Sequence, residues 1–126
     1  MNNITIGYLS WKRHDIFLQT LNSHKNNGLF EIIPPENRVI FFQEITDVDI
    51  NLAKQFNCNY IGDNQNIGIL NALIKLIGNC HTEYFIFCEN DWNLIENINT
   101  TYKMFEDCIE ILTTDFTFII QLQFLR

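Results

Sequence analysis

The sequence predicts a three-layer α/β domain in which helices cover both faces of a mostly parallel β-sheet. Strand-like and helix-like segments alternate along the whole chain, a pattern typical of parallel strands joined by helical crossovers. The composition is that of a globular protein, with 47% hydrophobic and 18% charged residues among 126. A chain of this length buries one core, so we expect residues 1–126 to form a single domain.

The first half of the chain predicts a strand, a helix and a second strand. Residues 4–9, ITIGYL, are typical of a buried strand, and the apolar spacing between Asp15 and Asn22 predicts a short helix. Residues 26–37, NNGLFEIIPPEN, contain a double proline and are expected to form a loop. Residues 38–44, RVIFFQE, are rich in strand formers and predict the second strand.

Two further helices flank a short third strand. Thr46 followed by Asp49 resembles a helix-capping pair and predicts a helix over residues 47–57. A strand is expected around residues 58–62, CNYIG. The next helix ends near Gly78. The predicted apolar face of the helix over residues 47–57 consists of Val48, Leu52, Ala53 and Phe56. That of the helix ending near Gly78 consists of Leu70, Leu73, Ile74 and Ile77.

The last third of the chain predicts a strand, a long helix and a final strand. The segment YFIFCENDW, residues 84–92, begins as a run of strand formers. Alternation with a period of two predicts a strand over residues 116–124. Between them, a long amphipathic helix is predicted by apolar residues spaced three and four apart, namely Ile95, Ile98, Tyr102, Phe105, Ile109 and Leu112.

Charge and cysteine content narrow the possible functions. The net charge of −7 argues against binding to nucleic acid or anionic membranes, although a metal ion would allow binding of an anionic small molecule. The four cysteines show no CxxC spacing and are expected to be reduced, mostly buried thiols. Neither a signal peptide nor an apolar run of about 18 residues is visible, so we expect a cytoplasmic protein without a transmembrane segment.

Two carboxylates, Glu89 and Asp91, directly follow the apolar run of residues 84–88. Ligands of open α/β sheets bind beyond the carboxyl ends of the strands. Two like charges at this position become favourable around a hard divalent cation with oxygen ligands, for which Mg²⁺ or Mn²⁺ fits better than zinc. The alternative is a solvated loop whose acids precede the next helix.

Other polar segments are expected at the same edge of the sheet. The glycine-bounded loop of residues 62–68, GDNQNIG, opens a helix and suits phosphate, although a plain turn with a helix cap explains it equally well. The cluster Lys12-Arg13-His14 would neutralise a diphosphate, and Glu44 would accept hydrogen bonds from a base or ribose. Ordinary surface charge is the alternative for both. The three histidines lie in unrelated segments, and none is paired with a nucleophile in the sequence.

Taken in order, these segments resemble the nucleotide-sugar half of a GT-A glycosyltransferase, most closely family 2. The resemblance covers roughly residues 4–124. It is carried by ITIGYLSWKR, a helix ending in TLNS, a strand ending at Glu44, NQNIGILNALI, and YFIFCENDW in place of the strand that leads into the DxD metal motif. It implies a Rossmann-like GT-A fold and a nucleotide-diphosphate sugar as donor.

The resemblance also implies roles for individual residues. Asp91 matches the acid that binds Mn²⁺ or Mg²⁺, and Glu89 stands where the first Asp of the motif is usual. Ser10 and Glu44 would line the nucleoside pocket. A third pair, Asn66 and Gly68, would shape the donor site. The implied reaction transfers the sugar, with inversion, to an acceptor hydroxyl of a glycan, protein or lipid.

The sequence departs from the family pattern at its end. Family members carry a further half with acceptor contacts and the catalytic base, whereas this chain stops at Arg126. We therefore expect a truncated domain that acts with a partner chain or as an oligomer, and no residue is assigned as the base. The alternatives are a non-catalytic donor-binding or interaction domain, and nucleotidyl transfer, for which the expected glycine- and lysine-rich loop near the first strand is lacking.

Overall fold

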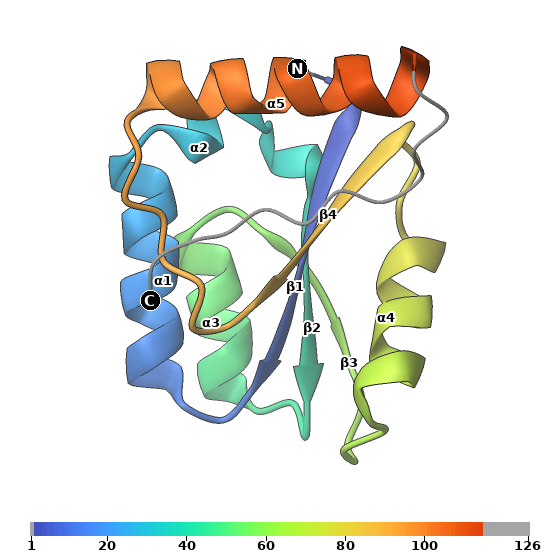
Figure 1. Cartoon of the computed structure of the whole chain (residues 1–126). Helices are drawn as coiled ribbons and strands as arrows, with labels where there is room; N and C mark the ends of the chain where they lie inside the picture. The colour runs from blue at the N-terminus through green and yellow to red at the C-terminus, as the bar shows by residue number, and fades with distance from the viewer. Residues whose placement is uncertain (1, 115–126) are drawn as a thin grey trace.

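The computed structural model describes residues 2–114 and has an α/β architecture (Figure 1). Its strands are β1 (Ile4–Trp11), β2 (Arg38–Gln43), β3 (Asn59–Gly62) and β4 (Tyr84–Glu89). Within the described residues these four form one all-parallel sheet in the order β3-β2-β1-β4. The predicted α/β class and parallel sheet are confirmed, and this strand order is consistent with a Rossmann-like fold. The strand predicted over residues 116–124 lies outside the described residues.

Helices cover both faces of the sheet, as the sequence predicts. The helices described are α1 (His14–Asn26), α2 (Leu29–Ile32), α3 (Asp47–Gln55), α4 (Ile69–Gly78) and α5 (Ile98–Thr114). In Figure 1, α1 and α3 lie on the opposite side of the sheet from α4, and α5 crosses the end at which the strands begin. Two elements correct the predicted loop over residues 26–37, namely α2 and a 3₁₀ turn over Pro35–Asn37. Each is about one turn long, too short to show a helical period.

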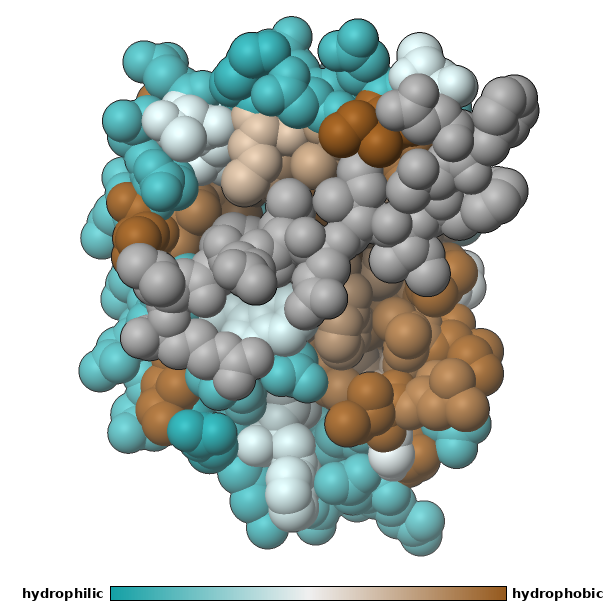
Figure 2. Space-filling model, in the orientation of Figure 1, coloured by the Kyte–Doolittle hydropathy of each residue, from teal (hydrophilic) through white to brown (hydrophobic). Residues whose placement is uncertain are grey.

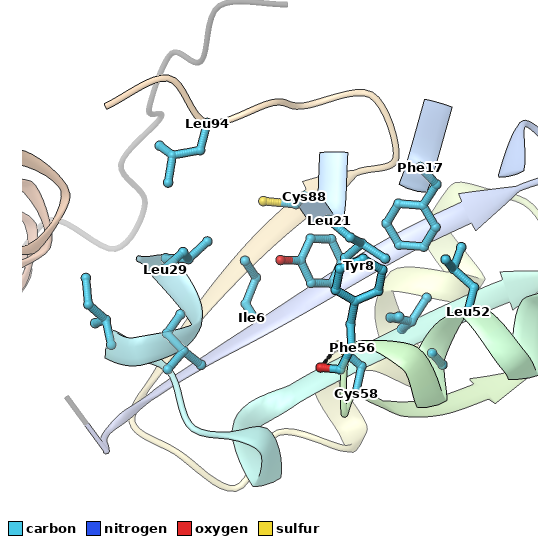
Figure 3. Close-up of a cluster of buried hydrophobic side chains, with 14 of the residues drawn as sticks. Ile6, Tyr8, Phe17, Leu21, Leu29, Leu52, Phe56, Cys58, Cys88 and Leu94 are labelled. Carbon is cyan, nitrogen blue, oxygen red and sulfur yellow. Dashed lines mark hydrogen bonds between the residues drawn. The ribbon is translucent and has the colours of Figure 1, made fainter. Parts of the chain in front are cut away.

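Alternate residues of β1 supply two cores, one on each face of the sheet. Tyr8 faces the larger core under α1 and α3, and Leu9 faces the smaller core under α4. Figure 3 shows Tyr8 beside Phe17 and Leu21 of α1, and the Tyr8 and Phe17 ring centroids are 5.7 Å apart. The two cores together fix β1 as the centre of the fold.

The capping prediction for α3 is confirmed. Thr46 and Asp49 form a reciprocal capping box at its start. Leu52, Ala53 and Phe56 are buried as predicted, but Val48 is 56% exposed. In the first turn of α3 it is the capping Asp49, 3% exposed, and not Val48 that faces the interior.

The predicted apolar face of α4 is wrong, although the helix itself is confirmed. The structure buries Ala72 and Leu76 against the sheet and leaves Leu70, Ile74 and Ile77 more than half exposed. The segment ILNALIKLIG is apolar around most of its circumference, so two stripes fit a helical period. Ala72 and Leu76 pack with Leu9 of β1, and the exposed residues contribute to an apolar surface over α4 in Figure 2.

The long helix α5 is also confirmed, with a later start than its pattern suggests. Phe105 is buried, whereas Tyr102 is 43% exposed and Ile95, which precedes the helix, is 55% exposed.

The cysteines are free thiols, of which Cys58 and Cys88 are buried and the other two half-buried. None of the helices within residues 2–114 has both the length and the apolar character needed to cross a membrane.

Candidate functional site

The order in which strands are added to the sheet reverses between β1 and β4. The chain proceeds outward from β1 through β2 to β3, and then returns to add β4 on the other side of β1. In open α/β sheets, ligands bind in the crevice that this reversal leaves beyond the carboxyl ends of the strands. Those ends lie toward the lower side of Figure 1. The candidate site is therefore bordered by Trp11, the last residue of β1, and Glu89, the last residue of β4.

Ser10 and Asn90 meet at this junction. Leu9 lies opposite Glu89 in the parallel register, so Ser10 and Asn90 follow as neighbours. The Asn90 side-chain amide lies 3.5 Å from the Ser10 hydroxyl oxygen. Ser10 is only 1% exposed, so it lies beneath the surface at this end of the sheet.

Glu44 joins the ends of β1 and β2. Its carboxylate accepts a hydrogen bond from the indole N–H of Trp11 and lies 3.8 Å from the ammonium of Lys12. The Lys12 ammonium also lies 5.0 Å from the centroid of the Trp11 ring, within cation–π range. Both charged groups are substantially exposed, so these contacts order the edge more than they stabilise the fold.

The backbone at this edge adopts uncommon conformations. Lys12, Arg13 and Glu44 have φ values of 55°, 56° and 48°, in the left-handed region that non-glycine residues rarely enter. Such residues cost about 1–3 kcal/mol each and cluster at functional sites. The turn formed by Lys12 and Arg13 exposes two cationic side chains at this end of the sheet. Among the described residues, Arg13 makes no salt bridge.

His14, at the start of α1, ties that helix to α3. Its Nε2 lies 2.6 Å from Oδ1 of Asp49, whose other carboxylate oxygen accepts the Thr46 N–H at 2.9 Å. Asp49 is 3% exposed. Within the basic cluster Lys12-Arg13-His14, His14 therefore connects α1 with α3. The side chains of Lys12 and Arg13 are exposed.

The loop of residues 62–68 is held by Gln43, which sequence reasoning missed. The buried Gln43 side chain accepts the Ile67 N–H at 2.8 Å and donates to the Gly68 carbonyl at 3.0 Å. The Asn66 side chain accepts the Gly68 N–H at 2.9 Å. Gly68 has a φ of 82°, and a Cβ added there would meet no heavy atom within 4 Å, so the conformation rather than crowding favours glycine. The sequence feature that could have indicated this role is a glutamine at the end of an otherwise apolar strand.

Gly68 leads into α4 at the same edge. Within residues 2–114, no side chain caps the first turn of this helix. Helix N-termini with unbonded N–H groups suit anions. Asn66 and Gly68 lie next to the end of β2 and not at the β1–β4 junction itself, and their role in a donor site stays a prediction.

Glu89 and Asp91 lie where β4 passes into a half-buried turn. Because side chains alternate along a strand, Cys88 faces the core under α1 and Glu89 faces the α4 side. Burial raises the pKa of Cys88 to about 12, so this neighbour is an uncharged thiol at neutral pH. No salt bridge within residues 2–114 involves Glu89.

The donor set suits a metal ion shared with a substrate. The described part of the chain contains no cluster of three or more His, Cys, Asp or Glu side chains able to hold a metal by itself. Mg²⁺ is usually bound by one or two carboxylates together with substrate phosphates and water. Two carboxylates without a third protein ligand would correspond to that arrangement rather than to a permanent protein cage.

Comparison with known proteins identifies no family. No protein-family model matches the chain, and no curated protein matches it. Function is therefore inferred from the residues at the sheet edge and from the topology that brings them there.

Proposed function

We propose that this chain is the nucleotide-sugar-binding part of a metal-dependent glycosyltransferase with the GT-A fold. The observation that carries the proposal is the adjacency of the ends of β1 and β4. Glu89 and Asp91 stand at the end of β4, and the exposed Lys12 and Arg13 follow the end of the neighbouring β1. A nucleoside diphosphate bound through a divalent cation requires both kinds of group.

The proposed roles follow from the chemistry of each group. Glu89 and Asp91 would hold Mn²⁺ or Mg²⁺, which when bound would neutralise charge on the leaving nucleoside diphosphate. Lys12 and Arg13 would contact the phosphate oxygens. Glu44, oriented by Trp11, would accept a hydrogen bond from the nucleoside, and Ser10 would support the floor through Asn90.

The loop of residues 62–68 would form the remaining wall of the donor site. Gln43 holds the backbone of Ile67 and Gly68, so the loop is ordered before any ligand arrives. A pre-ordered loop binds with a smaller loss of conformational freedom. No residue is assigned as the catalytic base, and the acceptor, whether glycan, protein or lipid, is left open.

A thermal-shift screen tests this proposal. The purified chain is heated with UDP-, GDP-, dTDP- and CMP-sugars, each with Mn²⁺ and with EDTA. A ligand that binds only the native state raises its apparent stability by mass action. We expect one nucleotide family to raise the Tm with Mn²⁺ and not with EDTA. A folded sample that shows no metal-dependent shift with any donor would contradict the proposal, and binding without sugar transfer to any acceptor would favour a non-catalytic donor-binding domain.

A further inference from the structure

One face of α1 carries four polar residues that contact the segment after β4. These residues, here called the α1 seam, lie at i, i+3, i+4 and i+7 and are Thr20, Ser23, His24 and Asn27, the last being the residue that follows the helix. Three of them bind alternate backbone carbonyls of residues 90–94. Thr20 Oγ1 donates to Asn90 at 2.8 Å, His24 Nε2 to Trp92 at 2.8 Å, and Asn27 Nδ2 to Leu94 at 2.9 Å.

The three donors are four and three residues apart along α1, a helical rise of about 6 Å and about 4.5 Å, and they reach alternate carbonyls of residues 90–94. The fourth member, Ser23, accepts the Leu94 N–H at 2.9 Å and donates to the Thr20 carbonyl at 2.7 Å. The segment is thus held against α1 by both N–H and carbonyl groups.

The seam is buried and its hydrogen bonds are directional. Thr20 and His24 are 0% exposed. Because the Trp92 carbonyl only accepts, His24 Nε2 carries the proton and Nδ1 accepts from the Tyr8 hydroxyl at 2.6 Å. Tyr8 belongs to β1, so His24 connects residues 90–94 to the central strand of the sheet. Buried polar networks with satisfied partners specify one arrangement.

Asp91 lies between Asn90 and Trp92, whose carbonyls accept hydrogen bonds from Thr20 and His24. Asn90 is bonded to Thr20 and its side chain reaches Ser10, while Trp92 is bonded to His24. We propose that the α1 seam positions the Asp91 carboxylate for metal binding, with Thr20 and His24 as positioning residues. This inference rests on the proposed metal-dependent function.

The test uses two variants of Thr20 in the full chain. Thr20→Val keeps the shape and removes the hydroxyl, whereas Thr20→Ser keeps the hydroxyl. The control is Thr5→Val, the same change at a buried threonine whose hydroxyl lies 2.7 Å from that of Thr82, near the other end of β1. Because the proposed site shares the metal with substrate phosphates, the probe is Mn²⁺ together with UDP or GDP, and protein-bound Mn²⁺ is measured by equilibrium dialysis.

Partners that orient metal ligands typically contribute about 10–100-fold to metal affinity. We expect Thr20→Val to weaken Mn²⁺ binding at least about tenfold on this basis, with Thr20→Ser and Thr5→Val within about twofold of the parent. Ser23→Ala gives a second, milder variant that is expected to weaken binding in the same direction if Thr20→Val does not fold.

The two proposals fail in different ways. Equal Mn²⁺ affinity in the parent, Thr20→Val and Ser23→Ala would overturn the positioning role and leave the metal site standing. A parallel loss of affinity in Thr5→Val would likewise overturn it, because general destabilisation would then explain the effect. A parent chain that does not bind Mn²⁺ would overturn the proposed function and this inference with it.

Discussion

The hydroxyl of Tyr8 lies 2.6 Å from Nδ1 of His24, in the buried layer between β1 and α1. The other ring nitrogen lies 2.8 Å from the Trp92 carbonyl, so one imidazole connects the central strand, the first helix and the segment after β4. Burial lowers the pKa of His24 to about 4, with the bond to Trp92 opposing part of that effect. The imidazole is therefore neutral in the folded protein at neutral pH.

This depressed pKa makes stability fall on acidification. The unfolded chain takes up a proton on His24 below about pH 6.5, whereas the folded chain does so only near pH 4, so protonation favours unfolding between these values. The full contribution is present above pH 6.5 and is lost by pH 4, about 3 kcal/mol in all. Urea unfolding at pH 7, 5.5 and 4.5 measures it.

The comparison variant for this pH dependence is His24→Gln. It removes the titrating group, so its free energy of unfolding should fall less steeply than that of the parent over the same range. Parallel curves for the two proteins would mean that His24 is not responsible for the acid sensitivity.

Arg38 stabilises the start of β2 through three carbonyl groups. Its guanidinium donates to Ile33 at 2.8 Å, Phe30 at 2.6 Å and Phe56 at 3.1 Å, and the side chain is nearly buried. Arg38→Met keeps the apolar stem but leaves these carbonyls without the donor, so we expect a loss of roughly 3 kcal/mol or more.

Arg38→Lys provides the graded comparison in the same urea experiment. It keeps the charge without the planar fork and should retain only part of the stability. Unchanged stability in both variants would show that the three carbonyls have other partners.

Gly28 separates α1 from α2 where α5 begins. It has a φ of 84°, and an added Cβ would lie 2.6 Å from Cβ of Ile98. Gly28→Ala should therefore cost about 2 kcal/mol or more from strain and overpacking. Gly78→Ala is the control, because nothing lies within 4 Å and a helical Ala is favoured by about 0.5–1 kcal/mol. Equal effects on Tm would contradict the close approach of Ile98.

The orientation of α4 is tested by one buried and one exposed leucine. Leu76 is fully buried, so Leu76→Ala should cost about 2–5 kcal/mol. Leu70 is 69% exposed, and Leu70→Gln should change the free energy of unfolding by less than about 0.5 kcal/mol. If Leu70→Gln is the more damaging change, the helix is rotated toward the face that the sequence pattern predicts.

The structural features that could be predicted from the sequence are those that show a periodic apolar pattern or a local motif. The strand pattern of residues 84–88 and the Thr46–Asp49 cap depend on neighbours in the chain, and both are confirmed. The buried face of α4 could not be predicted, because nearly all its residues are apolar and the choice depends on packing against Leu9, Val39 and Phe41 of the sheet.

The candidate site was only partly visible for a related reason. Acids and bases after strands are conspicuous, so the sequence points to the carboxylates and the basic cluster, whose roles stay predictions. The α1 seam was missed because polar residues on a helix indicate solvent, although Thr20 and His24 are 0% exposed. The signal was present in the helical spacing of Thr20, Ser23, His24 and Asn27, but only the structure pairs them with residues 90–94.

The most direct test of the proposed function is calorimetric titration of UDP and GDP in the presence of Mn²⁺, comparing the parent chain with Asp91→Asn. The control is Glu96→Gln, which removes the same charge from an exposed position a few residues away. We predict that Asp91→Asn weakens metal-dependent binding of the preferred nucleotide at least about tenfold, as expected for a lost metal ligand, while Glu96→Gln binds like the parent. Equal affinity in Asp91→Asn and the parent would contradict the assignment of the metal site.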